Sequence, residues 1–218
     1  MIPKIIHYIW LGNNPLPQLV KDNNKVISSD WEVKIWTDKD FTFEECQWVK
    51  EAKSLNLYMY CSDALRFYII KKYGGIYLDV DVQLYKLPYN LLHLPYVIGN
   101  DQHNIVNSAN SGVLLAEPNN NVMNELWEYY KSTILIKNGY YLQVNDVDRL
   151  RMWLRNKSVY TANSVDEYTN NINKYDICLF HQDGWHIYNP NLDYSFFSHF
   201  HQKTWKNSFK RHNYFIKI

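Results

Sequence analysis

The stretch that most constrains the fold of this chain reads SDALRFYIIKKYGGIYLDVDVQL and runs from residue 62 to residue 84. Ser62 is a favourable N-cap for a helix, and the glycine pair Gly74 and Gly75 is typical of a helix C-terminus. An apolar strand pattern over Ile76–Val80 follows directly. A helix is therefore predicted to lead through two glycines into a buried strand.

Two carboxylates stand at the end of this apolar strand. Because side chains two residues apart in a strand point to the same face, Tyr77, Asp79 and Asp81 are predicted to share one side of it. A buried carboxylate has to be paired or has to bind a metal. Two carboxylates so placed could share a hard cation, or one could bind a metal while the other binds a hydroxyl group.

The rest of the chain alternates strand patterns with helix patterns. Further strands are predicted at residues 4–10, 31–36, 96–99, 112–116 and 177–180, and further helices at 16–27, 42–54, 122–131 and 147–156. The helix at 42–54 is predicted to start with a capping box of Thr42 and Glu45. This alternation favours an α/β fold with a mainly parallel, twisted sheet flanked by helices. Such sheets bind ligands at the carboxyl ends of their strands, where Trp10, Asp38 and the aspartate pair fall.

Bulk properties exclude several other classes of protein. The chain has 218 residues and a formal net charge of +1, which argues against a nucleic-acid partner. Its three cysteines lie far apart and lack a CxxC spacing, which argues against a disulfide framework and a zinc site. The apolar run at the N-terminus is short and contains His7 and Trp10, so it is interpreted as a strand rather than a signal peptide. On these grounds a cytoplasmic location is expected.

One interpretation of the strand that ends in DVDV is a phosphohydrolase of the haloacid-dehalogenase type. Asp79 would then attack a phosphoryl group, and Asp81 would act as general acid and base. Two observations count against this interpretation. The motif of those enzymes usually lies near the chain start, and it needs a downstream acidic pair for magnesium. The segment NDVDRL at residues 145–150 is a poor candidate for that pair because it lies on a predicted helix.

The wider context of the two aspartates resembles the signature of DXD-motif glycosyltransferases of the GT-A fold. The nearest resemblance is to the Och1-like and capsular-polysaccharide sugar transferases, with the catalytic domains of the large clostridial glucosylating toxins as more distant relatives. PKIIHYIWLG and WEVKIWTD resemble two early strands of the family, and SHFHQKTWK resembles its closing His-x5-Trp element. The central matching residues are Ser62, Asp63, Arg66, Tyr73, Gly74, Gly75, Tyr77, Leu78, Asp79 and Asp81.

The resemblance implies one GT-A-like domain with a Rossmann-like, nucleotide-binding part at about 1–100, an acceptor part at about 101–198 and a closing element at 199–218. It also implies metal-dependent transfer of a sugar from a nucleotide-sugar donor, with a UDP-sugar favoured over a GDP-sugar. The acceptor would be a saccharide or a lipid-linked saccharide, and the anomeric configuration would be retained. For a cytoplasmic bacterial enzyme, this activity suggests capsule or lipopolysaccharide assembly. A non-catalytic saccharide-binding relative is the alternative, and the presence of both Arg66 and Asp81 counts against it.

The resemblance also implies roles for individual residues. Asp81 would bind Mn²⁺ or Mg²⁺, and Asp79 would contact the donor. Asp63 and Arg66 would contact hydroxyl groups of the donor sugar, although their spacing on a helix equally fits a surface salt bridge. Trp10 would stack on the nucleotide base, with core packing as the alternative.

The closing element adds a histidine and a tryptophan to these candidates. His199 would lie near the metal or the diphosphate, with His201 as the alternative, and Trp205 would contact the donor. The remaining candidates on the donor side are Tyr77, Asn110, Asp101 and Lys203.

The last residues of the chain mix basic and aromatic side chains. The segment WKNSFKRHNYFIKI, residues 205–218, carries Lys206, Lys210, Arg211 and Lys217. If it is helical, it could rest on an anionic membrane surface, which would suit an enzyme that acts on lipid-linked saccharides at the inner face of a membrane. The simpler interpretation is a solvated terminal helix that covers the core.

Overall fold

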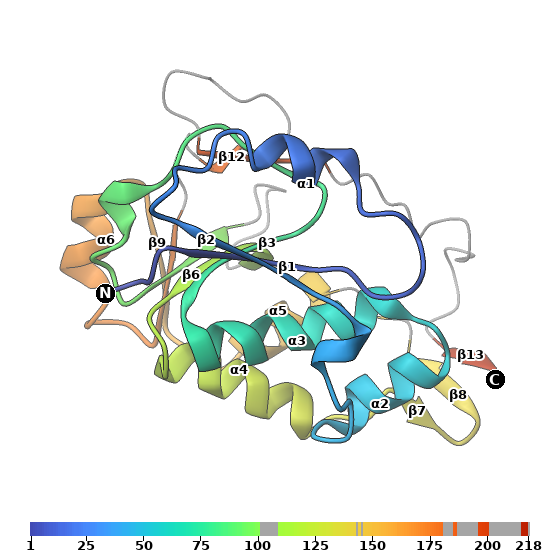
Figure 1. The fold of residues 1–218 in the computed structure, drawn as a ribbon. Coiled ribbons are helices and arrows are strands. Elements are labelled where there is room, and N and C mark those ends of the chain that lie inside the picture. The colour runs from blue at the N-terminus through green and yellow to red at the C-terminus, as the bar shows by residue number, and fades with distance from the viewer. Residues whose placement is uncertain are drawn as a thin grey trace.

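A seven-stranded sheet forms the centre of the molecule (Figure 1). The computed structural model describes residues 1–100, 109–142, 144, 146–180, 185–186, 196–200 and 215–217. In sheet order, the strands are β2 (Glu32–Trp36), β1 (Ile5–Ile9), β3 (Gly75–Leu78), β6 (Ala109–Ala116), β5 (Tyr96–Asn100), β10 (Ile177–Phe180) and β9 (Val159–Ala162). Among these strands, β6 pairs antiparallel with β3 and β5, and the other neighbours pair parallel. The predicted α/β class with a mainly parallel sheet is confirmed.

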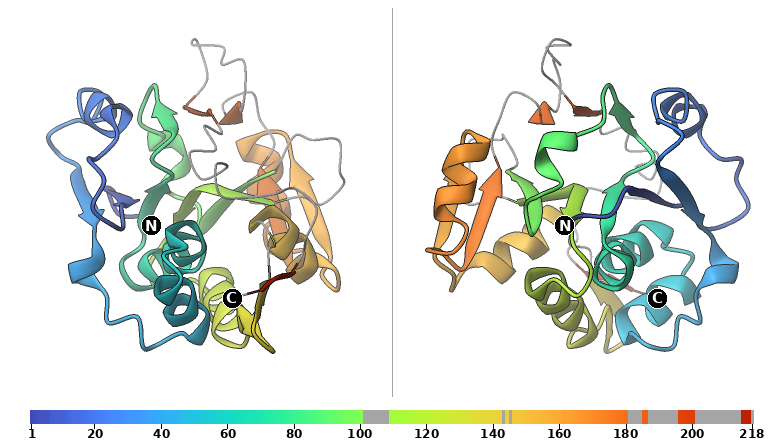
Figure 2. Two further views of the ribbon diagram at one scale, coloured as in Figure 1. Left: turned by 90° about the vertical axis from the view of Figure 1, so that its right-hand side faces the viewer. Right: turned by 60° about the vertical axis from the view of Figure 1, so that its left-hand side comes forward.

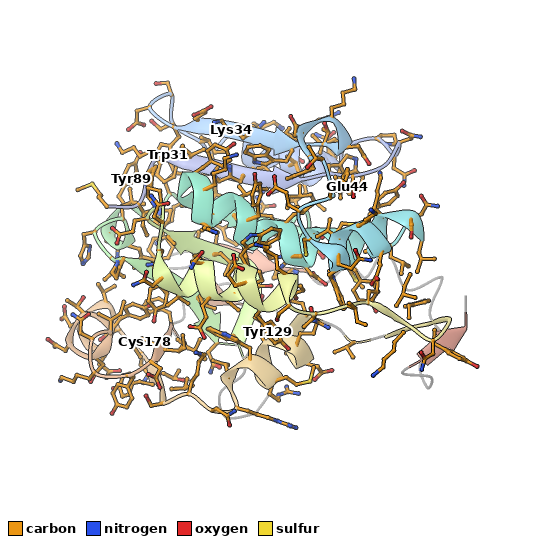
Figure 3. The ribbon with its side chains drawn as sticks, turned by 90° about the horizontal axis from the view of Figure 1, so that it is seen from below. Trp31, Lys34, Glu44, Tyr89, Tyr129 and Cys178 are labelled. Carbon is orange, nitrogen blue, oxygen red and sulfur yellow. The ribbon has the colours of Figure 1, made fainter. Side chains whose placement is uncertain are left out.

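Helices cover both faces of this sheet. Those described are α1 (Gln18–Asn23), α2 (Gln47–Ser54), α3 (Tyr58–Tyr73), α4 (Asn121–Lys131), α5 (Asp146–Leu154) and α6 (Val165–Asn171). Helices α3 and α4 pack side by side on one face, as Figures 2 and 3 show, and α1 lies on the other. Buried aromatic rings connect α3 and α4, because Phe67 of α3 stacks on Tyr130 of α4 with ring centroids 5.7 Å apart. In the described part of the chain, no helix is both long and apolar enough to cross a membrane.

Two small sheets extend the fold. Strand β4 (Val82–Leu84) pairs antiparallel with β12 (Phe197–His199), which also pairs with β11 (Trp185–His186). Strand β8 (Tyr140–Leu142) lies between β7 (Ile136–Lys137) and β13 (Phe215–Lys217). Residues 215–217 of the basic C-terminal segment are thus extended rather than helical, and residues 205–214 lie outside the described part. The pairing of β12 with β4 brings residues near 199 next to the segment that follows Asp81.

The starts of α2 and α3 differ from the sequence prediction. Helix α2 begins at Gln47 rather than at Thr42, because Phe43 adopts a left-handed backbone conformation with φ of 59° that no helix start accommodates. Helix α3 begins at Tyr58, one turn before the predicted cap Ser62. The hydroxyl of Ser62 instead donates to the carbonyl of Met59 within the helix. The earlier start lets α3 bury the additional apolar surface of its first turn.

The strand after the glycine pair also ends earlier than predicted. Strand β3 stops at Leu78, and Asp79–Val82 forms a turn in which the Val82 N–H donates to the Asp79 carbonyl at 3.0 Å. The prediction that strand alternation places Asp79 and Asp81 on one face is therefore wrong. A turn brings the two side chains together instead.

The glycine pair is required by the close approach of β1 to the end of α3. Gly74 has φ of 64° and ends the helix as predicted. Gly75 has φ of 96°, and a Cβ there would lie 2.6 Å from the Ile5 carbonyl oxygen and 3.0 Å from Nε2 of His7. Only glycine fits both the backbone conformation and this space.

His7 is buried at this junction in its neutral form. Its Nε2 donates to the Gly74 carbonyl at 2.9 Å, and its Nδ1 accepts from Nε1 of Trp36 at 3.0 Å. These two bonds specify one tautomer, and a second proton on the ring would break the bond from Trp36. Burial lowers the pKa of His7 from 6.5 to about 4.

We expect His7 to make the folded state less stable in acid. Between pH 6.5 and about 4 the unfolded chain binds a proton at His7 that the folded chain does not, so stability falls as the pH falls through this window. The loss at pH 4 is about 3 kcal/mol. His7→Gln cannot titrate, and urea unfolding between pH 7 and 4 should show this part of the pH dependence missing. An identical pH dependence in both proteins would contradict the prediction.

Candidate active site

The candidate site lies at the edge of the sheet where β1 and β3 end. These strands are parallel neighbours with His7 level with Tyr77, so the segments that begin with Trp10 and Asp79 leave the sheet at the same edge. The loop after β2 joins the same edge, because the Gly12 N–H donates to Oδ2 of Asp38 at 2.7 Å. The predicted gathering of polar residues at the carboxyl ends of the strands is observed.

Asp79, Asp81 and His199 converge on one point of this edge. Nε2 of His199 lies 3.0 Å from Oδ1 of Asp81 and 3.8 Å from Oδ2 of Asp79. The Phe200 N–H donates to the Asp81 carbonyl at 3.0 Å, which fixes the end of β12 against the turn. One ligand atom from each of the three residues lies within 4.8 Å of the others.

This arrangement suits a divalent cation. The side chains of Asp79, Asp81 and His199 keep 22%, 21% and 13% of their surface exposed, so the cluster is open on one side. Two carboxylates and one imidazole are a suitable donor set for Mn²⁺, and the open side leaves room for water or phosphate oxygens. Burial alone would lower the pKa of His199, but its bond to Asp81 and the charge of Asp79 raise it. Cation binding would therefore compete with a proton on this ring.

Gly112 of β6 makes room for the cluster. A Cβ at this position would lie 2.7 Å from Cε1 of His199 and 3.0 Å from Oδ2 of Asp79. The Gly112 carbonyl also accepts the Asp79 N–H at 2.8 Å. The backbone of β6 thus contacts the cluster directly, and this role is not evident from the sequence.

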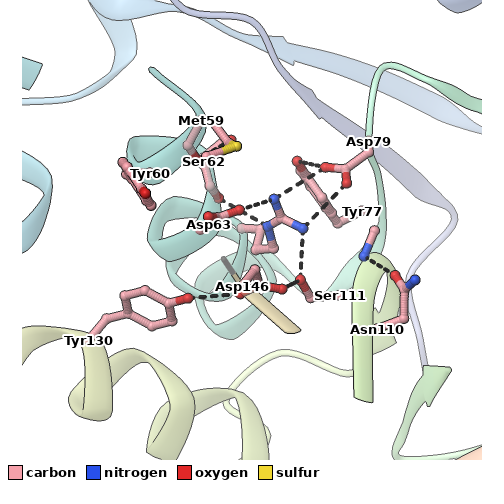
Figure 4. A network of polar contacts seen from close by, with 12 residues as sticks. Met59, Tyr60, Ser62, Asp63, Tyr77, Asp79, Asn110, Ser111, Tyr130 and Asp146 are labelled. Carbon is pink, nitrogen blue, oxygen red and sulfur yellow. Dashed lines mark hydrogen bonds and ion pairs between the residues drawn. The ribbon is translucent and has the colours of Figure 1, made fainter. Parts of the chain in front are cut away.

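Asp63 and Arg66 form a buried ion pair rather than a surface salt bridge. Each side chain is only 4% exposed, and Nη2 of Arg66 lies 2.7 Å from Oδ1 of Asp63. The same nitrogen lies 3.3 Å from Oδ1 of Asp79, which connects the pair to the cluster (Figure 4). Burial opposes the charge of Arg66, but its electrostatic interactions with Asp79, Tyr77 and Asp63 raise its pKa well above the ordinary value. Arg66 is therefore a permanent cation beside Asp79.

Tyr77 braces the same carboxylate. Its hydroxyl donates to Oδ1 of Asp79 at 2.7 Å, and the Arg66 guanidinium lies 5.0 Å from the centre of its ring. Burial raises the pKa of Asp79, and the nearby charge of Arg66 opposes that change. Asp79 thus contacts the buried Tyr77 and Arg66 on one side and lies near Asp81 and His199 on the other.

The remaining predicted residues lie nearby or outside the described part of the chain. Trp10 is half-buried, and its Nε1 donates to the Asn14 carbonyl at 2.7 Å. Asn110 is buried at the start of β6, and its Oδ1 accepts from the Gly112 N–H at 2.8 Å. The residues outside the described part are Asp101, His201, Lys203 and Trp205.

Three residues of the polar network were not predicted. Ser111 accepts from Nη1 of Arg66 at 2.8 Å and donates to Oδ2 of Asp146, while the Tyr130 hydroxyl donates to Oδ1 of Asp146 at 2.8 Å. They come from β6, α5 and α4. The only sequence signal was the acidic character of the segment around Asp146, which was considered for a magnesium pair and set aside.

Residues 10–101 match a family model described as "Glycosyltransferase sugar-binding region containing DXD motif". This stretch includes Trp10, Asp63, Arg66, Asp79 and Asp81. Residues 10–101 are therefore similar to the sugar-binding region of DXD glycosyltransferases, and the predicted resemblance is confirmed.

Individual relatives cover different shares of the chain. An inositol phosphoceramide mannosyltransferase of Schizosaccharomyces pombe is 35% identical over 100 residues, which are 43% of this chain and 28% of that protein. An uncharacterized glycosyltransferase of Acanthamoeba polyphaga mimivirus is 26% identical over 189 residues, 82% of this chain and 70% of that protein. Among solved structures, the PaToxG glycosyltransferase overlaps 70% of this chain and 68% of its own with a TM-score of 0.47 and 18% identity. The match to the yeast enzyme thus spans little more than a quarter of that enzyme's length.

We predict that Gly112→Ala weakens Mn²⁺ binding. Because a methyl group there overlaps His199 and Asp79, those side chains have to move apart, and an affinity loss of roughly tenfold or more is expected. Titration of the protein with Mn²⁺, followed by the electron paramagnetic resonance signal of the free ion, measures the loss.

Gly139→Ala is a suitable control for this change. Gly139 has φ of 76° and nothing within 4 Å of the added Cβ, so the substitution strains the backbone far from the cluster. It should lower the melting temperature and leave Mn²⁺ affinity unchanged. An unchanged affinity in Gly112→Ala would show that the cluster does not bind the ion.

Proposed function

We propose that this protein transfers a sugar from a nucleotide-sugar donor to a saccharide or glycolipid acceptor, with a divalent cation bound at Asp79, Asp81 and His199. The observation that supports this most strongly is the convergence of these three side chains within 4.8 Å, next to a buried arginine. Asp79 and Asp81 lie within the stretch that matches the glycosyltransferase model. The cation is proposed to be Mn²⁺, with Mg²⁺ as the alternative.

The chemistry of sugar transfer explains why such a cluster is useful. Negative charge grows on the diphosphate as the sugar leaves, and a divalent cation bound at the cluster would neutralise that charge. Asp79 is the acid between the buried network and the open side, so we propose that it faces the donor. Arg66 and Asp63 are almost fully buried, so their main task would be to hold Asp79 in place.

The finer features of the donor are also proposals. Trp10 is proposed to stack on the base, because it follows β1 at the same edge of the sheet as Asp79 and is half-buried. A UDP-sugar is favoured over a GDP-sugar, although the Schizosaccharomyces pombe relative is named a mannosyltransferase, so both nucleotides belong in the test. Retention of configuration is proposed from the resemblance, and the anomeric configuration of the product, determined by NMR, decides it.

The acceptor is proposed to be a saccharide or a glycolipid of a cell-surface polysaccharide pathway. The Schizosaccharomyces pombe relative is named an inositol phosphoceramide mannosyltransferase, which supports the glycolipid option. A bacterial source, a cytoplasmic location and peripheral contact with the inner face of a membrane follow only from the sequence expectations. Co-sedimentation with anionic liposomes measures the contact, and a protein that stays in the supernatant would rule it out.

The phosphohydrolase alternative is less consistent with the site. A nucleophilic Asp79 needs an oxygen with free access to phosphorus, but Oδ1 accepts from Tyr77 and both oxygens face Arg66. The match over residues 10–101 likewise supports a transferase.

We predict that UDP or GDP stabilises the protein only when Mn²⁺ is present. A ligand at about one hundred times its dissociation constant adds roughly 2.7 kcal/mol, which raises the melting temperature of a chain of this size by about 5–10 °C. Thermal unfolding is measured with each nucleotide, with and without the metal. Asp81→Asn should abolish the metal-dependent shift because it removes one charged ligand.

Asp166→Asn is the matched control. Asp166 is exposed on α6, far from the cluster, and its substitution should leave the shift intact. If neither nucleotide shifts the wild type with either metal, the proposed donor site is wrong.

A further inference from the structure

A chain of hydrogen bonds runs through the interior behind Arg66 (Figure 4). It starts at the Tyr130 hydroxyl on α4, passes through Asp146 at the start of α5 and Ser111 on β6, and ends at the guanidinium on α3. Four elements from distant parts of the sequence thus meet at one buried charge. None of the four residues belongs to the proposed metal cluster.

The donors and acceptors in this chain have one consistent order. Arg66 can only donate, so the Ser111 hydroxyl oxygen accepts from it and directs its single proton to Asp146. Tyr130 donates to the other oxygen of Asp146. Asp146 therefore orients the Ser111 hydroxyl, and the oxygen of that hydroxyl accepts from Arg66.

Distances show which contacts determine the position of Arg66. Its nitrogens lie 2.7 Å from Asp63, 2.8 Å from Ser111 and 3.1 Å from the Ser62 carbonyl. Its two contacts with Asp79 are longer, at 3.3 and 3.5 Å. The three short contacts hold the guanidinium in place. The longer contacts with Asp79 therefore contribute less to the position of Arg66.

Burial makes each of these anchors important. Ser111 is 1% exposed and Tyr130 is fully buried, so water cannot readily replace a lost hydrogen bond at either residue. Asp63, Asp79 and Asp146 also surround Arg66 with three carboxylates. A displaced guanidinium would leave those charges to repel one another.

We infer that Tyr130, Asp146 and Ser111 are positioning residues of the donor site: they hold the charge of Arg66 in place beside Asp79. This inference rests on the proposed function, because it assigns the network to the same site. The three residues act through Arg66 and need not touch the donor, the metal or the acceptor.

Four variants test the inference. Ser111→Ala removes the central hydroxyl, and Ser111→Thr retains a hydroxyl at the same carbon. Tyr130→Phe removes one hydroxyl and keeps the ring that packs on Phe67. Tyr168→Phe is the matched control, because its buried hydroxyl lies within hydrogen-bond distance of the Tyr96 and Cys178 carbonyls, outside this network.

The first measurement does not depend on activity or on metal. In the metal-free protein, ¹⁵N NMR of the guanidinium should show slowly rotating, hydrogen-bonded N–H groups for Arg66. These signals should broaden or disappear in Ser111→Ala, weaken in Tyr130→Phe and return in Ser111→Thr. Tyr168→Phe should keep them.

The second measurement is the affinity for UDP or GDP with Mn²⁺, by calorimetry. Ser111→Ala should weaken it roughly tenfold and Tyr130→Phe about threefold, since one lost buried hydrogen bond changes an equilibrium by about that much. Tyr168→Phe should leave the nucleotide affinity unchanged, although its stability should fall by about as much as that of Tyr130→Phe.

Two outcomes would overturn the inference. Intact Arg66 signals in both Ser111→Ala and Tyr130→Phe would show that the network does not hold the guanidinium. Altered signals with an unchanged nucleotide affinity would show that the guanidinium position does not matter to the donor site. If the wild type binds neither nucleotide, the proposed function fails instead, and the NMR result still decides whether the network positions Arg66.

Discussion

The buried charge of Arg66 is the interaction on which the rest of this site depends. A guanidinium with 4% of its surface exposed has lost most of its hydration. It is stable there because carboxylates, the Ser62 carbonyl and the Ser111 hydroxyl accept hydrogen bonds from it. Its partners come from α3, β6 and the turn after β3. Arg66 therefore requires these elements to meet in one arrangement, and that arrangement holds Asp79 next to the open edge of the sheet.

The open half of the site is built by backbone pairing rather than by charge. The turn at Asp79–Val82 is followed by β4, and β12 pairs with β4 so that His199 lies level with Val82. Gly112 has no side chain to obstruct the histidine. Asp79 and His199, which are 120 residues apart in the sequence, thus share one cluster because β12 pairs with β4 and β6 has a glycine beside them. One half of the site is buried and the other is partly exposed, which is the combination that the proposed metal site needs.

Local signals were enough to predict the central supersecondary unit. The conformation of Gly74 ends α3, and the apolar residues after it form β3, as the pattern indicated. Helix starts were less predictable, because Thr42 and Ser62 have good capping chemistry but the conformation of Phe43 and the burial of the first turn of α3 override it. The resemblance to a family, rather than any spacing, placed His199 near the aspartates.

The buried network was beyond the reach of sequence reasoning for a physical reason. Ser111 and Asp146 are 35 residues apart and bond only because β6 and α5 pack together. Nothing local distinguishes such a serine from one in a turn. The spacing of Asp63 and Arg66 likewise fitted an exposed salt bridge, and only tertiary packing makes the pair internal.

Crystals grown with Mn²⁺ and the nucleotide that stabilises the protein would test the central claim most directly. An anomalous difference map at the manganese absorption edge is predicted to show one strong peak between Asp79, Asp81 and His199, with diphosphate oxygens on its open side. A peak elsewhere, or bound nucleotide with no metal at these three side chains, would contradict the account.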